Sequence, residues 1–161
     1  MSRWTEQQQR DHRRRLVDEL RTGHYQQAYG TLRAPAPEQP RGRSRYAYCI
    51  MGVACEVSGL GSWARLNDEG QRYVTGMNEG AGGMLNRTLC EYYGFATETG
   101  DFQEERHDPF NAPALVWTSL VAKNDGRITL RELADIIEAE PPGLIGDYLT
   151  PLQVKKEKGV D

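Results

Sequence analysis

Three kinds of side chain that cooperate in amide hydrolysis occur along this chain in a workable order. Cys49 stands where a helix is expected to begin, and a helix amino terminus can acidify a thiol and make it a nucleophile. Downstream, His107 is a candidate base, and Asn124 or Asp125 is a candidate group to orient it. The order predicts a cysteine-dependent amide hydrolase if the fold brings these residues together.

A glutamine upstream of the cysteine would complete such a site, since Gln26 or Gln27 could donate to an oxyanion. Papain-like enzymes have this chain order of Gln, Cys, His and Asn, but their local cysteine signature is absent here. Cys49 lies inside an apolar run, which indicates a buried and inert thiol. His107 lies among charged residues, which indicates a solvated loop. We therefore keep the hydrolase as an alternative and assign no catalytic residue.

The turn after Asn124 resembles the second half of an EF-hand calcium loop. With Gly126 at loop position 6, Glu132 falls at position 12, where a calcium loop needs a carboxylate. Positions 1 and 3 would then be Val121 and Lys123, which offer no oxygen ligand. We expect no metal here, and we expect a helix–turn–helix element instead.

Capping signals and apolar spacing place the elements around these residues. Thr129 and Glu132 form a capping box that starts one helix, and Thr5 and Gln8 form another. Asn111 with Pro113 is typical of a helix start. The pattern predicts helices over 5–21, 49–57, 84–93, from 111 onward and 129–140, extended segments at 25–31 and 72–75, and a hairpin from 95–97 to 102–104.

These elements predict one compact α+β domain over residues 1–140, with four to five helices and a small antiparallel sheet. The apolar stretch from Tyr46 to Val57 is expected at the centre of its core. An exposed loop rich in Pro and Arg is expected at 34–45, and a C-terminal extension at 141–161.

Composition and charge narrow the function classes. The 161 residues include three cysteines, Cys49, Cys55 and Cys90, in neither a zinc nor a disulfide pattern. The chain shows no signal peptide and no apolar run that could cross a bilayer, so we expect a cytoplasmic protein without a membrane segment. The glycine-rich stretch 80–83 lacks the Lys-Ser/Thr end of a phosphate loop, and we expect no cofactor.

The basic charge is concentrated near the amino terminus, where residues 1–46 carry ten arginines against five acids. Because acids alternate with the arginines, the pattern favours a solvated helix face. No motif typical of nucleic-acid binding accompanies it, so we do not expect a nucleic-acid partner.

The order of landmarks resembles uncharacterised small proteins of actinobacteria and their bacteriophages, including mycobacteriophages. Those proteins carry a Gln after the first helix, a Cys-x-x-Gly-Val/Ala segment and an Asn-Asp turn before the last helix. The matching residues here are Tyr25-Gln26, Cys49-Ile50-Met51-Gly52-Val53 and Asn124-Asp125-Gly126. The resemblance covers most of residues 5–140, and the 34–45 insert and the tail after 140 depart from it. It implies a phage or actinobacterial origin and brings no activity.

The sequence thus predicts a non-enzymatic phage-type accessory protein that binds a host macromolecule, with a host or phage protein as the expected partner. Two surfaces are candidates for this binding, namely the arginine-rich first helix with the 34–45 loop, and the apolar C-terminal segment. A homo-oligomer through the C-terminal segment and a component of the virion stay open as alternatives. The candidate binding residues are Arg10, Arg13, Arg14, Arg41, Arg43, Leu144 and Tyr148.

Overall fold

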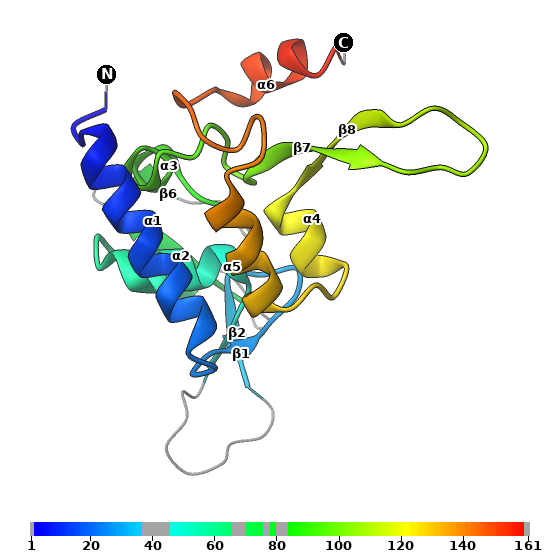
Figure 1. The fold of residues 1–161 in the computed structure, drawn as a ribbon. Helices are drawn as coiled ribbons and strands as arrows, with labels where there is room; N and C mark the ends of the chain where they lie inside the picture. Colours follow the sequence, from blue (N-terminus) through cyan, green and yellow to red (C-terminus); the bar gives the residue numbers. More distant parts are fainter. Residues whose placement is uncertain (1, 37–45, 66–69, 76–77, 80–83, 160–161) are drawn as a thin grey trace.

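The computed structural model describes residues 2–36, 46–65, 70–75, 78–79 and 84–159, and it has an α+β architecture (Figure 1). Capping residues begin the helices as predicted: Thr5 and Thr129 each form a complete capping box. A third capping box, at Thr150, starts a short C-terminal helix that was not predicted, so the described residues form six helices rather than four or five. They are α1 (Glu6–Arg21), α2 (Ile50–Ser58), α3 (Arg87–Tyr93), α4 (Leu120–Asp125), α5 (Leu130–Ala139) and α6 (Pro151–Glu157).

The larger sheet has the strand order β1-β3-β2-β5-β4, with β6 paired to β5. It is mixed rather than antiparallel, because β1 runs parallel to β3. The reason lies in a turn at Gly30 (φ 73°), which reverses the chain between β1 and β2. Since β3 is antiparallel to β2, it must then run parallel to β1. The strands are β1 (Gln26–Gln27), β2 (Arg33–Pro35), β3 (Tyr46–Tyr48), β4 (Ser62–Arg65), β5 (Gln71–Thr75) and β6 (Asn78–Glu79).

A second sheet consists of one hairpin, β7 (Asp101–Arg106) with β8 (Ala114–Ser119), which projects from the body of the molecule (Figure 1). The predictions for this region were wrong, because no 95–104 hairpin forms, and Asn111 starts no helix: the chain continues as β8 before α4 begins at Leu120. The run Val116-Trp117-Thr118 is β-branched and aromatic, and it pairs with β7 in full register. Asn111 donates its side-chain N–H to Asp108 in the connecting loop instead of capping a helix.

Helix α2 lies at the centre of the core, which confirms the prediction for the apolar stretch. The same core contains Leu16, Val17 and Leu20 of α1, which packs on α2, and Leu133 and Ile137 of α5. In Figure 1, α1 and α5 lie side by side in front of α2.

Gly52 lets α2 lie close to the backbone of Leu32, the residue just before β2. A β-carbon at this position would lie 1.8 Å from the backbone oxygen of Leu32, so no larger residue fits without a backbone shift. The small residue in the Cys-x-x-Gly landmark therefore has a packing reason.

Residues 141–149 pack on the domain rather than extending away from it. The backbone N–H of Ala96 donates to the carbonyl of Leu144 at 3.0 Å, and Phe95 forms an isolated bridge with Ile145. Leu144 is fully buried, which corrects its assignment to an exposed binding surface. Beyond this segment, α6 contributes no buried residue.

Candidate functional site

Cys49 is the N-cap of α2, as the hydrolase alternative requires, but its sulfur is engaged in the cap. The backbone N–H of Gly52 donates to Cys49 Sγ at 3.4 Å. Cys49 is buried and lines a cavity of about 200 Å³ together with Thr31, Thr99 and Asn124. Burial raises the pKa of Cys49 to about 11, so the thiol is protonated at neutral pH.

Asn124 lies beside this cap and makes four hydrogen bonds. Its Oδ1 accepts from Gln27 Nε2 at 3.0 Å and from the backbone N–H of Ile50 at 3.1 Å. Its Nδ2 donates to the carbonyl of Ala28 at 2.9 Å and to Asp125 Oδ1 at 3.2 Å. An amide side chain has two acceptor positions and two donor hydrogens, so this fully buried group is saturated.

Of the two candidate glutamines, Gln26 and Gln27, the cluster contains Gln27. Gln26 is exposed, whereas Gln27 donates to Asn124 and to the carbonyl of Ile128 at 2.7 Å. The alternation of side chains along β1 explains the choice, because neighbouring residues of a strand point to opposite faces. Gln27 and Asn124 therefore hydrogen-bond each other, and Cys49 lines the same small cavity as Asn124.

The structure does not bring His107 into this cluster. His107 follows β7 on the projecting hairpin, its side chain is 75% exposed, and Glu105 lies 3.9 Å away. Within the described part of the chain, no histidine lines the cavity beside Cys49. The structure therefore does not assemble the four residues of the hydrolase alternative. His107 had been chosen by its order along the chain, which does not determine its position in the fold.

The EF-hand-like turn also uses its oxygen atoms for the fold. Asp125 Oδ1 accepts the backbone N–H of Gly30 at 2.9 Å, which ties the turn to the sheet. Glu132 completes the capping box of α5 with Thr129, as predicted. The hydrogen bonds of this region fix the positions of α4, α2 and β1 relative to one another.

A larger groove, of about 710 Å³, runs between the first turns of α1, the helix α3 and the loop 145–148. It collects three of the predicted binding residues, Arg10, Arg13 and Tyr148, which the sequence had assigned to two separate surfaces. Arg87 of α3 also lines it, with its guanidinium 5.4 Å from the centre of the Tyr148 ring.

Arg13 is part of the fold as well as of the groove wall, which corrects its assignment to an exposed face. Its side chain is 7% exposed, and its Nη1 donates to the carbonyl of Tyr93 at 2.6 Å. Its Nη2 forms a 2.9 Å ion pair with Glu140, the residue that ends α5. Such a pair is needed because an unpaired buried guanidinium would be costly.

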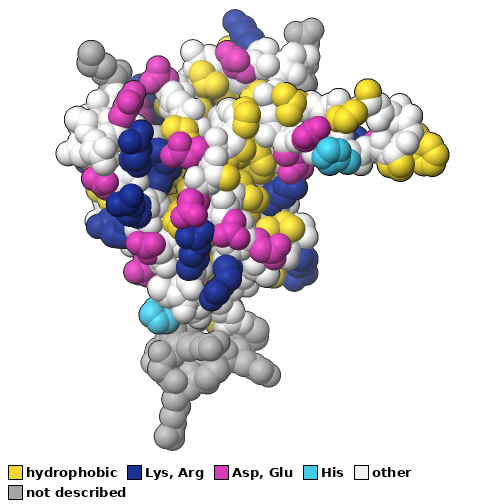
Figure 2. Space-filling view, in the orientation of Figure 1, with side chains coloured by type: hydrophobic (Ala, Val, Ile, Leu, Met, Phe, Trp, Pro, Cys, Tyr) yellow, Lys and Arg dark blue, Asp and Glu magenta, His cyan; other side chains and the backbone are white. Residues whose placement is uncertain are grey.

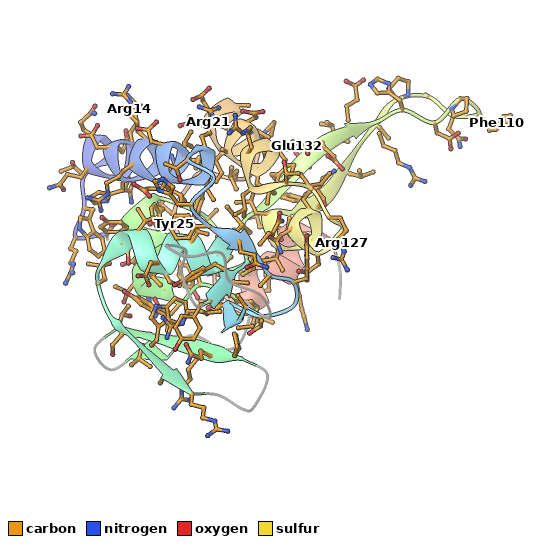
Figure 3. All side chains as sticks on the ribbon, turned by 90° about the horizontal axis from the view of Figure 1, so that it is seen from below. Arg14, Arg21, Tyr25, Phe110, Arg127 and Glu132 are labelled. Atoms are coloured by element: carbon orange, nitrogen blue, oxygen red, sulfur yellow. The ribbon has the colours of Figure 1, made fainter. Side chains whose placement is uncertain are left out.

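The other predicted binding residues have varied positions. Tyr148 is half-buried, and its hydroxyl donates to Glu98 Oε1 at 2.8 Å; burial is the main cause of its raised pKa. Arg14 is exposed and points away from the body of the molecule (Figure 3). Arg41 and Arg43 lie outside the described residues.

Positive charge on the face of α1 and α5 is largely neutralised. Figure 2 shows basic and acidic side chains interleaved over this face. Arg21 forms ion pairs with Asp135 at 2.7 Å and with Glu138 at 2.9 Å. The hydrogen bond from Arg21 lowers the pKa of Glu138 and in turn raises that of Arg21. The face is therefore a mixed-charge surface and not a basic patch.

Sequence reasoning missed the exposed apolar residues of the β7–β8 hairpin. Phe110 is 91% exposed and lies at the end of the hairpin, far from the body (Figure 3). Leu115 on β8 is also exposed. The signal that could have revealed them is the strand-like run 116–118, which was interpreted as helical.

Comparison of the chain with protein-family models, with curated proteins and with solved structures found no match. Among the described helices, none combines the length and the apolar character needed to cross a bilayer.

Proposed function

We propose that this chain is a non-enzymatic accessory protein of the phage type, and that it acts by binding another protein in the groove between α1, α3 and the loop 145–148. The observation that carries the proposal is the state of Arg10. Within the described part of the chain, Arg10 makes no hydrogen bond or ion pair, although it lines a large polar groove. A charged group that lines a concave site and has no partner within the chain is available to a ligand.

The charges around Arg10 indicate the kind of segment that would bind. Arg13 is paired with Glu140, and Arg87 is paired with Glu91 at 2.8 Å, so these four charges are already balanced. Arg10 is left to receive a carboxylate of the partner. The exposed acids Glu6 and Asp147 also line the groove, make no ion pair among the described residues, and are left to receive a cation. We infer that the partner presents a polar segment with an acidic side chain opposite Arg10.

The state of the Cys49 cluster supports a binding role over hydrolysis. The Cys49 thiol is protonated at neutral pH, and the amide of Asn124 has no free position. The hydrolytic alternative would need both a thiolate and an amide oxygen free to accept from an imidazole.

The test is affinity co-purification from an actinobacterial lysate, with proteins identified and quantified by mass spectrometry. Tagged wild type is compared with Arg10→Glu, which reverses the unpaired positive charge of Arg10 in the groove. Lys155→Glu is the matched control, because it reverses an exposed charge on α6, outside the groove. We expect a protein that wild type and Lys155→Glu retain and that Arg10→Glu loses. Equal retention by all three chains, or no retained protein, would count against the groove.

A further inference from the structure

A second cavity, of about 290 Å³, lies beneath α6 and is separate from the Cys49 cluster. Its walls are mainly apolar and come from β8, from the loop 143–149 and from α6 itself. The apolar side chains that line it are Ala96, Trp117, Ile145, Leu149 and Val154.

Three carboxylates line this cavity: Asp147 and Glu157 are exposed, and Asp101 is buried in the wall. Its side chain is 6% exposed, and its Oδ1 accepts from the hydroxyl of Thr99 at 2.8 Å. Its Oδ2 forms a 3.0 Å ion pair with the ammonium of Lys158, just beyond the last turn of α6. A carboxylate in such surroundings requires a cation, because its charge is largely removed from water.

The indole ring of Trp117 provides a second contact for that cation. Lys158 Nζ lies 5.7 Å from the centre of the ring, within the range of a cation–π interaction. Gly143 (φ +90°) makes room for the ring, since a β-carbon there would lie 2.7 Å from Trp117 Cζ3. Carboxylate, aromatic ring and apolar walls together form a receptor for an ammonium group on an aliphatic chain.

Lys158 is held in this receptor by a weakly anchored element. Helix α6 has no buried residue, and Leu152 on it is 67% exposed. Figure 1 shows α6 at the edge of the molecule, next to the end of the chain. Lys158, which follows α6, therefore belongs to a segment that can leave the domain without opening the core.

We propose that this cavity binds the side chain of a lysine from a partner protein, and that Lys158 holds the ammonium position beside Asp101 as a built-in competitor in the free chain. The incoming lysine would place its ammonium between Asp101 and Trp117 and its four-carbon stem against Ile145 and Leu149. This site goes beyond the proposed function and does not use the charge of Arg10, although the loop 145–147 lines both the cavity and the groove.

Competition by Lys158 should weaken the apparent affinity of the cavity for an external ammonium by a measurable factor. If Lys158 occupies the site more than nine-tenths of the time, it weakens the apparent affinity for an external ammonium by at least about tenfold. Lys158→Gln removes the competing charge and should restore the full affinity. The substitution changes a half-buried residue outside the core, so the chain is expected to fold.

The test uses n-butylammonium, which has the length of a lysine side chain, as the probe. Binding is followed by NMR through the indole N–H signal of Trp117, assigned with a Trp117→Phe chain. We expect Lys158→Gln to bind the probe at least about tenfold more tightly than wild type. The uncharged n-pentanol should bind Lys158→Gln more weakly than n-butylammonium. Nα-acetyl-lysine N-methylamide should bind at least as tightly as n-butylammonium, and weaker binding would exclude a protein lysine as the ligand.

The role of the carboxylate is tested with the double variant Asp101→Asn and Lys158→Gln, which should lose the preference for n-butylammonium over n-pentanol. Should that chain fail to fold, the comparison of the two probes on Lys158→Gln alone still decides. Equal affinity of wild type and Lys158→Gln for n-butylammonium would overturn the proposal. Equal affinity of Lys158→Gln for n-butylammonium and n-pentanol would also overturn it. An Arg10→Glu chain carrying Lys158→Gln should bind the probe normally, which separates this result from the test of the groove.

Discussion

Replacement of Asn124 by alanine should destabilise the protein far more than the loss of one surface amide would. The change removes four hydrogen bonds and leaves the backbone N–H of Ile50 and the carbonyl of Ala28 without this partner in the interior. Each buried group left unsatisfied costs about 1–3 kcal/mol. We therefore expect the free energy of unfolding to fall by about 3–4 kcal/mol, a large part of the total of a typical domain.

Urea denaturation at 25 °C, followed by circular dichroism, measures this loss. Wild type, Asn124→Ala and the control Asn111→Ala are compared under the same conditions. The control removes an amide from the exposed loop of the β7–β8 hairpin, where it bonds only Asp108 among the described residues. It should change the free energy of unfolding by less than about 0.5 kcal/mol. In a thermal melt, Asn124→Ala should lower the midpoint by about 10 °C.

Two results would refute the reasoning. A loss below about 1 kcal/mol for Asn124→Ala would mean that water or a neighbouring group satisfies the exposed partners. A similar loss in Asn111→Ala would mean that the effect comes from the amide itself and not from its buried position. Either result would contradict the explanation that Asn124 stabilises the fold through its buried hydrogen bonds.

Three further predictions follow from the packing, the ion pairs and the thiols. Gly52→Ala should cost about 3 kcal/mol or more in urea denaturation, because its β-carbon would collide with the backbone of Leu32. Arg13→Ala should cost about 2–3 kcal/mol and Arg10→Ala less than about 0.5 kcal/mol by the same assay, because only Arg13 makes buried charged hydrogen bonds. The raised pKa of Cys49, about 11, contributes stability that is complete below the unfolded pKa of about 8.5 and is lost as pH rises to about 11. Urea midpoints measured from pH 8 to 11 should therefore fall with pH, and less steeply in Cys49→Ser.

Elements defined by nearby residues could be predicted from the sequence. The capping boxes at Thr5 and Thr129 each join residues three positions apart, so their chemistry is visible in a short window. The burial and pairing of Arg13 could not be predicted from a short window, because its partners lie 80 and 127 positions away in the sequence. The burial of Leu144 likewise depends on Ala96, which approaches it only in the folded chain.

In the β7–β8 hairpin, strand pairing overrides a local sequence pattern that is typical of a helix start. Asn111 and Pro113 are typical of a helix start, and the residues after them contain enough apolar side chains for a helical face. In the structure, β7 offers six paired positions to β8. The β-branched and aromatic residues that follow are better accommodated in a strand, so the long-range pairing determines the element.

The saturation of Asn124 gives the landmark order a structural meaning. An asparagine that orients a catalytic histidine must accept from the imidazole through its side-chain oxygen. Here that oxygen already accepts from Gln27 and from the backbone N–H of Ile50 at the start of α2. To receive an imidazole it would have to release one of them, and each release would leave a donor near the core without its acceptor. The Gln, Cys and Asn residues that suggest a hydrolase by their order therefore meet for a different reason: they join β1, α2 and the α4–α5 turn.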